Sequence, residues 1–286
     1  MKMEKSFKVL AGIVTYNPDI ERLRENIDSI INQVEQVILV DNGSNNVIEI
    51  EEILAENSEL QLLKNGGNIG IAAALNKIGD YAVQENFDFF YTLDQDSVSF
   101  PNSISEMLKY NELPNIGLLN TYHKDRNFDK EIGKLKLWEN PCMITSGTLM
   151  PTKIFEKNYR YDERLFIDKV DYDIDISLMD AGFKLYQVPV YGLLHEVGAV
   201  DTKRLMGRQI LVYNHSSIRR YYISRNTVLL IKKHGIRKIT IKFLVDDIVK
   251  TFLTILYEEN KVKKLVQTYK GYRDGIKYKD SWKKLK

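Results

Sequence analysis

Short apolar runs alternate along this chain with segments in which apolar residues recur every three or four positions. The runs predict buried strands, and the recurring segments predict amphipathic helices. The expected strands are Val9–Val14, Gln36–Val40, Leu60–Leu63, Phe87–Leu93, Ile116–Asn120, Cys142–Met150 and Lys184–Val190. The expected helices are Pro18–Val34, Asn46–Asn57, Ile71–Gln84, Pro101–Tyr110, one that starts at Pro151–Glu156, and one from near Val170 to Ala181-Gly182. This alternation predicts an α/β fold, with right-handed crossovers and a largely parallel sheet between helices.

From Tyr221 onward the pattern becomes helical throughout. One apolar stripe consists of Ile241, Leu244, Val245, Ile248, Phe252, Ile255 and Leu256. Charged residues, Lys242, Asp246 and Lys250, lie opposite this stripe, so the segment is an amphipathic helix and not a membrane span. The pattern favours packing on the body of the protein or on a partner. Binding at a membrane interface is the open alternative.

The composition indicates a globular protein that carries no disulfide. Of its 286 residues, 44% are apolar and 28% are charged. The single cysteine, Cys142, excludes an internal disulfide and a multi-cysteine zinc site, which fits a reducing cytoplasm. The apolar run Val9–Val14 is too short for a spanning helix and lacks a cleavage pattern, so we interpret it as a strand and not as a secretory signal.

Charge is divided unevenly along the chain. Residues 1–200 carry 19 Lys and Arg against 32 Asp and Glu, whereas residues 201–286 carry 22 against 7. The basic segment includes Lys261, Lys263, Lys264, Lys283, Lys284 and Lys286. Such a segment suits an anion, which could be a lipid head group, a diphosphate or nucleic acid; a solvated basic helical face is the plainer alternative.

Two carboxylates, Asp94 and Asp96, directly follow the buried run Phe87–Leu93. They should therefore lie at the carboxyl end of a strand, where open α/β sheets bind ligands. Two oxygen ligands one residue apart can share a divalent cation, which could in turn hold a diphosphate. Turn formation explains the same residues without a metal.

Other polar residues follow the first strands. Thr15-Tyr16-Asn17 replaces the glycine-rich fingerprint of dinucleotide-binding folds, which argues against NAD or FAD. Asp41 ends the second strand and could accept hydrogen bonds from a nucleoside, or form an Asx turn. The glycines near Asn68 permit close backbone approach to an anion, and Asn76, eight residues later, could face the same pocket.

A second group of acids lies at Asp171, Asp173 and Asp175. On a helix that begins near Val170, Asp171 and Asp175 share a face. Each acid could instead stabilise the helix by a favourable interaction with the dipole at its amino end. His195 follows the strand Lys184–Val190 and could bind a metal or a phosphate.

In their order, these motifs resemble those of the inverting family 2 glycosyltransferases, and within them the bacterial rhamnosyltransferase group. The motifs are Thr15-Tyr16-Asn17, Asp41-Asn42-Gly43-Ser44, Asn65 to Asn76, Leu93-Asp94-Gln95-Asp96-Ser97, Phe166 to Asp173, His195-Glu196-Val197-Gly198 and Tyr221-Tyr222-Ile223-Ser224-Arg225-Asn226. The resemblance covers roughly residues 9 to 230. It implies a GT-A fold, with a Rossmann-like, mostly parallel central sheet flanked by helices and a basic helical extension at the carboxyl end.

The resemblance also implies roles for single residues. Thr15, Asn17 and Asp41 would hold the nucleoside, and Asn68 and Asn76 the sugar or phosphate side of the donor. Asp94 would meet the ribose or the metal, Asp96 would be the main ligand of Mg²⁺ or Mn²⁺, and His195 would complete the metal or diphosphate site. Arg225 would neutralise diphosphate charge. Asp171 matches the catalytic base, although Val170 replaces the acid usual before it, and Asp173 stands where the group more often has Glu.

From this resemblance we expect transfer of L-rhamnose from dTDP-L-rhamnose to a surface polysaccharide or a lipid-linked precursor. Residues 1–120 would bind the nucleotide sugar, 121–220 the acceptor, and 221–286 would form the basic helical segment. Asp96 and Asp171 should converge in one cleft. The enzyme would be cytoplasmic, without nucleic acid as a partner. Peripheral membrane contact and a homodimer stay open, as do a UDP- or GDP-sugar donor, a sugar nucleotidyltransferase and a non-catalytic carbohydrate-binding protein.

Overall fold

The computed structural model describes residues 7–126, 133–195, 201–205 and 207–279. Contacts divide the chain into two units, which are described separately below. The sheet unit comprises Met1–Glu163 and Ile174–Glu196, and the helical unit comprises Arg164–Asp173 and Val197–Lys286. Helix α6, Val170–Asp180, begins in the helical unit and continues in the sheet unit.

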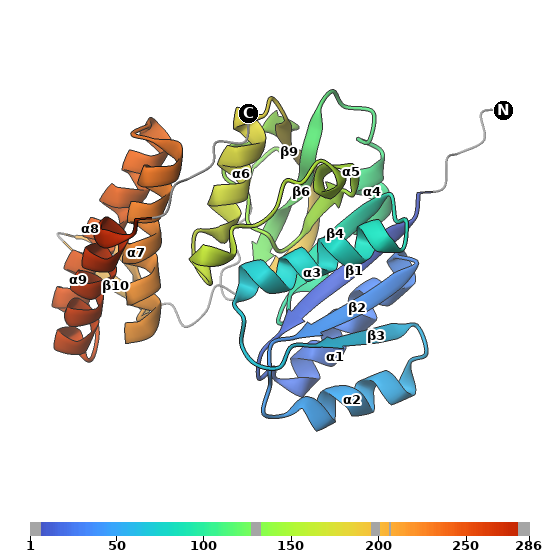
Figure 1. Cartoon of the computed structure of the whole chain (residues 1–286), viewed down its shortest axis with the longest axis horizontal. Helices are drawn as coiled ribbons and strands as arrows, with labels where there is room; N and C mark the ends of the chain where they lie inside the picture. Colours follow the sequence, from blue (N-terminus) through green and yellow to red (C-terminus); the bar gives the residue numbers. More distant parts are fainter. Residues whose placement is uncertain (1–6, 127–132, 196–200, 206, 280–286) are drawn as a thin grey trace. The chain divides into compact units, whose positions relative to one another are not determined.

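The sheet unit is built on one central sheet (Figure 1). Its strands are β1 (Val9–Thr15), β2 (Gln36–Asp41), β3 (Leu60–Lys64), β4 (Phe89–Asp94), β5 (Val98–Ser99), β6 (Ile116–Asp125), β7 (Trp138–Glu139), β8 (Thr148–Pro151) and β9 (Lys184–His195). The strand order is β3-β2-β1-β4-β8-β6-β9-β5, and β7 also pairs with β9. The first four strands are parallel, as expected, whereas β8 runs antiparallel between β4 and β6.

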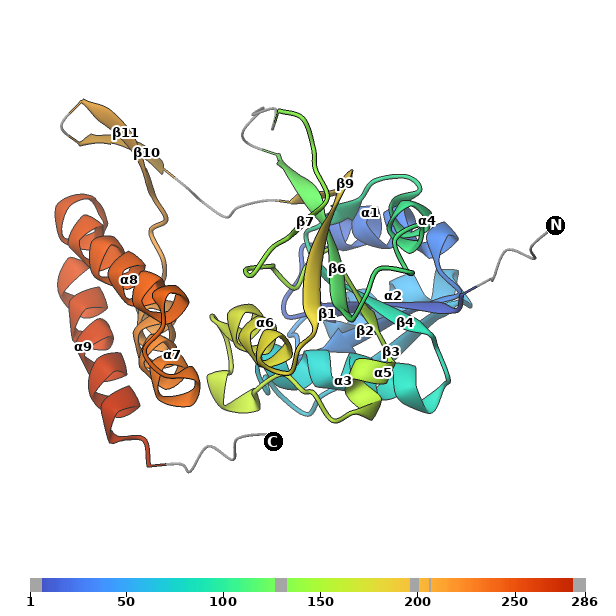
Figure 2. The ribbon, with the colours of Figure 1, turned by 90° about the horizontal axis from the view of Figure 1, so that it is seen from above.

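Helices cover both faces of this sheet. Helices α1 (Ile20–Ile30) and α4 (Ser103–Leu108) lie on one face, and α3 (Ile71–Gln84) and α5 (Lys153–Glu156) on the other (Figure 2). Helix α2 (Val47–Glu56) packs beside α1 through Ile50 and Ile53. In β1 a Cβ on Gly12 would lie 2.4 Å from the Ile78 side chain, so only glycine lets α3 approach this closely. The layered α/β architecture is therefore as predicted.

Several boundaries differ from the sequence-based expectations. The expected strand Cys142–Met150 is regular only over Thr148–Pro151, because Thr145 to Gly147 form a turn that places the Gly147 N–H on the Thr92 carbonyl. Strand β6 extends beyond the expected end at Asn120 as far as Asp125, and β9 extends beyond Val190 to His195. Both extensions arise because β6 and β9 pair with each other through irregularities in register.

The helical unit contains a β-hairpin and long helices. The hairpin consists of β10 (Asp201–Leu205) and β11 (Arg208–Val212), and the helices are α7 (Ser217–His234), α8 (Lys238–Tyr257) and α9 (Lys261–Lys277). Helices α7 and α9 approach closely, since a Cβ on Gly271 would lie 2.3 Å from the Tyr221 carbonyl oxygen. None of the described helices is both long enough and apolar enough to cross a membrane.

Candidate active site

The carboxyl ends of β1 and β2 are joined by hydrogen bonds to Asp41. The Thr15 hydroxyl donates to Asp41 Oδ1 over 3.0 Å, and the Gly43 and Ser44 amides each donate to Oδ2 over 3.0 Å. The Ser44 hydroxyl also donates to Oδ1. Because a carboxylate has about four acceptor positions, the chain itself fills them. Asp41 therefore stabilises this turn, and a nucleoside that contacted the carboxylate would have to displace one of these donors.

The Asn17 turn lies against the same loop. Asn17 has a left-handed backbone, with φ of 47°, and its amide donates to Ser44 Oγ over 2.8 Å. Its side-chain oxygen accepts from the Asn45 amide, and the neighbouring Tyr16 amide donates to Gln95 Oε1. The motifs that contain Asn17, Ser44 and Gln95 thus meet at one edge of the sheet.

The residues near the glycine-rich loop have different surroundings. Asn68 is exposed, and its side-chain oxygen accepts from the Gly70 amide over 3.0 Å immediately before α3. Asn76 is buried. Its amide donates to the Tyr161 carbonyl and to Glu163, and its oxygen accepts from the Tyr161 N–H. Asn76 therefore anchors the Tyr161 segment instead of presenting a free amide to a ligand.

The turn after β4 is held in place by its backbone. The Asp94 amide donates to Ser146 Oγ over 3.0 Å, and the Asp94 carbonyl accepts from the Asn26 side chain over 2.7 Å. The Ser97 amide closes the turn on the same carbonyl. The carboxylates of Asp94 and Asp96 stay partly exposed. This geometry fixes the positions of both acids, neither of which is fully buried.

His195 joins the two acids at this edge. Strand β5, immediately after the turn, pairs with the end of β9, and His195 lies opposite Asp125 of β6. Ligand atoms of Asp94, Asp96 and His195 all lie within 4.8 Å of one another. His195 Nδ1 is 3.4 Å from Ser97 Oγ, so a proton on Nδ1 would leave the lone pair of Nε2 for a cation. Two carboxylates and an imidazole form a donor set that suits Mn²⁺ or Mg²⁺.

Sequence reasoning overlooked His123, which lies beside this cluster. Its ring centroid is 6.5 Å from that of His195, and its Nε2 is 3.0 Å from Asn120 Oδ1. Burial, and secondarily the nearby His195, lower the pKa of His123 to about 4. His123 is therefore neutral at pH 7 and adds no positive charge next to the three ligands. His123 lies beyond the expected strand Ile116–Asn120, so no local sequence signal placed it beside His195.

Asp171 lies in the first turn of α6, within the helical unit. Its Oδ1 accepts from the Tyr172 amide over 2.9 Å, and burial raises the pKa of the Asp171 carboxyl to about 6. Asp173 differs, because it accepts from Lys233 and from His234 at 2.7 Å each. Asp175, in the sheet unit, accepts from the Met143 amide. Asp171 thus bonds to its neighbour in the chain, whereas Asp173 and Asp175 bond to segments 60 and 32 residues away.

The segment that leads to Asp171 is held in an unusual backbone conformation. Phe166, Asp168 and Lys169 all have left-handed φ values, between 63° and 69°. The Asn226 amide nitrogen lies 2.7 to 2.9 Å from the carbonyl oxygens of Leu165, Ile167 and Asp168. This single side chain therefore clamps the strained turn ahead of Asp171.

Arg225 supports the same turn. Its guanidinium donates to the carbonyls of Arg164 and Leu165, and it lies over the rings of Tyr221 and Tyr222. The Tyr222 ring stacks on Phe166 with centroids 5.0 Å apart. The Tyr-Tyr-x-x-Arg-Asn motif thus holds the segment that leads to Asp171, and Arg225 contacts protein carbonyls where the family resemblance implied a diphosphate.

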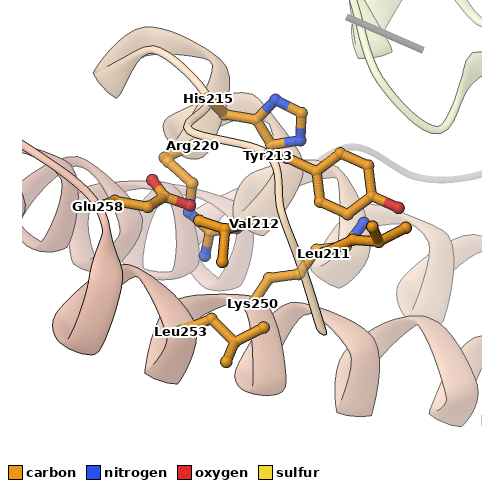
Figure 3. A pocket seen from close by; sticks show the side chains of 8 residues that line it. All are labelled: Leu211, Val212, Tyr213, His215, Arg220, Lys250, Leu253 and Glu258. Carbon is orange, nitrogen blue, oxygen red and sulfur yellow. The ribbon is translucent and has the colours of Figure 1, made fainter. Parts of the chain in front are cut away.

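The helical unit also encloses a small cavity of about 10 Å³ (Figure 3). Its lining residues are Leu211, Val212, Tyr213, His215, Arg220, Lys250, Leu253 and Glu258. This volume holds about one water molecule, so the cavity is too small for a nucleotide sugar.

Comparisons with known proteins point to one family of enzymes. Residues 11–148 match the model of the family described as Glycosyl transferase family 2. The chain is 28% identical, over 94% of its length and 95% of the relative, to dTDP-rhamnosyl transferase RfbF of Shigella flexneri.

Solved structures share the fold at low sequence identity. Residues 1–349 of TarS from S. aureus, in complex with UDP-GlcNAc, align with a TM-score of 0.62 and 14% identity, over 94% of this chain and 81% of that one. GalNAc-T7 with UDP, GalNAc and Mn²⁺ aligns with a TM-score of 0.57 and 15% identity, over 84% and 54%. These likenesses confirm the GT-A type of α/β fold. Residues 11–148 therefore form a family 2 glycosyltransferase domain.

Proposed function

We propose that this protein is an inverting glycosyltransferase that moves L-rhamnose from dTDP-L-rhamnose to a hydroxyl of a surface polysaccharide or a lipid-linked precursor. The proposal rests mainly on one observation, the grouping of Asp94, Asp96 and His195 within 4.8 Å at the sheet edge of a family 2 domain. The choice of donor is supported by the likeness to a dTDP-rhamnosyl transferase along 94% of the chain. We assign the reaction to the cytoplasm, which the single cysteine fits.

Asp94, Asp96 and His195 would hold Mg²⁺ or Mn²⁺. The hard carboxylate oxygens suit both ions, and the imidazole favours Mn²⁺ of the two. The cation, when bound, neutralises charge on the nucleoside diphosphate and so makes it a better leaving group. Ser97 and Ser146 orient the ligands, since they contact His195 Nδ1 and the Asp94 amide respectively.

The donor would lie along the loops that follow β1, β2 and β3. Thr15 and Asp41 are bonded to each other, so we assign them the shaping of the nucleoside loop. Asn17 and Asn68 would use their side-chain amide nitrogens on the donor. Asn76 and Arg225 would act indirectly, because their donors already hold protein carbonyls.

Asp171 would act as the general base. Its carboxylate would take the proton of the acceptor hydroxyl while that oxygen attacks the anomeric carbon, on the face opposite the diphosphate. The single displacement inverts the configuration at that carbon and requires no covalent sugar intermediate. A pKa of about 6 leaves roughly nine-tenths of the carboxyls ionised at pH 7 and brings their basicity near the operating pH. Its convergence with Asp96, which belongs to the other unit, stays a prediction.

A thermal-shift screen of the full chain tests the donor and the metal together. dTDP-L-rhamnose, a UDP-sugar and a GDP-sugar are each added with Mn²⁺ or with EDTA. At a hundredfold excess over Kd, a ligand that binds only the folded protein stabilises it by about 2.7 kcal/mol. We expect this shift for dTDP-L-rhamnose with Mn²⁺. A larger shift with a UDP- or GDP-sugar would overturn the rhamnose assignment, and an equal shift in EDTA would reject the metal.

Asp96→Asn sharpens this test. The variant should lose the Mn²⁺-dependent part of the shift, because it removes a charged ligand. The matched control is Asp28→Asn, which neutralises an exposed acid on α1 and should keep the full shift.

A further inference from the structure

On helix α8 large apolar side chains face solvent and polar side chains are buried, which is the reverse of an ordinary surface helix. Its solvent-facing stripe, here called the outer face of α8, consists of Ile241, Val245, Ile248, Val249, Phe252, Ile255 and Leu256. These side chains are between 40% and 55% exposed. Their spacing of three and four residues places them on one side of a helix 20 residues long, which spans about 30 Å.

The opposite side of α8 is buried and largely polar. Thr240, Asp247 and Thr254 are at most 1% exposed. Asp247 pairs with Arg220 of α7 at 2.9 Å and accepts from the Tyr272 hydroxyl of α9 at 2.7 Å. The helix is thus anchored to its own unit by hydrogen bonds and an ion pair, while most of its large aliphatic side chains face outward.

The sequence pattern favoured packing of this stripe on the body of the protein or on a partner. Within the helical unit these residues are exposed, so no element of that unit covers them. A contiguous apolar patch of this kind is rare on a soluble protein unless another apolar surface covers it. Helix α9 adds exposed Val262, Val266 and Tyr269 at the same spacing.

The charges on these helices indicate what covers the patch. The exposed lysines of α8 and α9 are Lys238, Lys242, Lys261, Lys263, Lys270 and Lys277, against the exposed acids Asp246 and Glu259. Lys264, in contrast, is buried against Glu258 and Asn214, and Lys283, Lys284 and Lys286 lie outside the described residues. A second copy of the chain would bring like charges together, whereas a surface of anionic lipids would neutralise them.

We propose that the outer face of α8 is a membrane-docking surface, which lies in the plane of a bilayer that contains anionic lipids. The apolar side chains would enter the boundary between head groups and acyl chains, and the flanking lysines would contact lipid phosphates. This inference does not depend on the proposed transfer reaction, and its test has no activity readout.

Flotation of the full chain with lipid vesicles tests the proposal. Vesicles of phosphatidylcholine alone are compared with vesicles that also contain phosphatidylglycerol. We expect the chain to float with the mixed vesicles, and less with the neutral ones. The double variant Ile248→Gln/Phe252→Gln should lower the vesicle partition coefficient by about tenfold or more, because two side chains that insert are lost.

The matched control is Ile48→Gln, which alters a side chain that is 67% exposed on α2 of the sheet unit and should leave flotation unchanged. Circular dichroism checks that each variant is folded. Failure of the wild-type chain to float, or equal flotation of the double variant, overturns the proposal. It is also overturned if sedimentation shows a dimer in solution that the double variant dissociates, since the outer face would then bind a second copy.

Discussion

The two units of this chain bury different kinds of side chain. In the sheet unit the fully buried residues are mainly aliphatic, such as Ile13 of β1 and Leu39 of β2. In the helical unit the buried set includes Arg220 and Asp247, while Ile248 and Phe252 are exposed. Hydrocarbon burial therefore stabilises the first unit, and specific polar pairing fixes the arrangement of the second. The following predictions test this difference, and the first concerns the catalytic role proposed for Asp171 in the helical unit.

The largest effect is expected at Asp171. Asp171→Asn should lower kcat by a factor of about 10² to 10⁴, because an amide cannot accept the acceptor's proton. Donor binding should be retained, since the proposed donor loops lie in the sheet unit. Turnover is followed as release of dTDP from dTDP-L-rhamnose, with Asp28→Asn as the control. Near-wild-type turnover would remove Asp171 as the base.

The buried ion pair of the helical unit provides the next effect. Arg220→Met should destabilise the protein by roughly 3–5 kcal/mol, because it leaves the Asp247 carboxylate buried beside an apolar group. The double variant Arg220→Met/Asp247→Leu should recover most of this loss. Urea unfolding followed by circular dichroism measures both. If the double variant were as unstable as the single one, polar pairing would not be what holds this unit together.

Truncation of an aliphatic side chain should have opposite consequences in the two units. Leu39→Ala, in the sheet core, should lower the free energy of unfolding by about 2–5 kcal/mol because it leaves a cavity. Ile248→Ala, on the outer face of α8, should change the free energy of unfolding by no more than about 0.5 kcal/mol in the absence of lipid. The comparison requires the same urea titration for both. A cost at Ile248 comparable to that at Leu39 would mean that the outer face is covered in solution.

The smallest effect concerns the pH dependence of stability. Burial raises the pKa of Asp171 to about 6 in the folded protein, from the 3.8 of an aspartate exposed to water. The folded state therefore binds this proton more tightly, and the contribution of the group to stability falls as pH rises from about 4 to 6. The free energy of unfolding of Asp171→Asn, taken relative to that of the wild type, should rise by up to about 3 kcal/mol between pH 4 and pH 7. A constant difference across this range would contradict the raised pKa.

The sequence predicted most of the sheet unit because its signals are local. Apolar runs in β1, β2 and β4 each end in a polar turn, and a strand end fixes where the next side chain lies. Asp94 and Asp96 could thus be placed at the sheet edge from sequence alone. His195 was proposed there from the family resemblance, and the structure places its ligand atom within 4.8 Å of those of both acids.

Other features depend on contacts between distant segments. The roles of Ser146 and Asn226 could not be deduced, since one bonds to an amide 52 residues away and the other to carbonyls about 60 residues away. The orientation of α8 could not be deduced either. Its periodicity identified one apolar side, but periodicity carries no information about which side meets the rest of the protein.

The ion pair between Arg220 and Asp247 gives the two units different responses to temperature. Cooling weakens hydrophobic stabilisation, which the sheet unit depends on. Warming lowers the cost of removing charged groups from water, so a buried pair becomes relatively more favourable as the temperature rises. Near the freezing point the β-rich part of this chain should therefore loosen first, while its helices keep their arrangement.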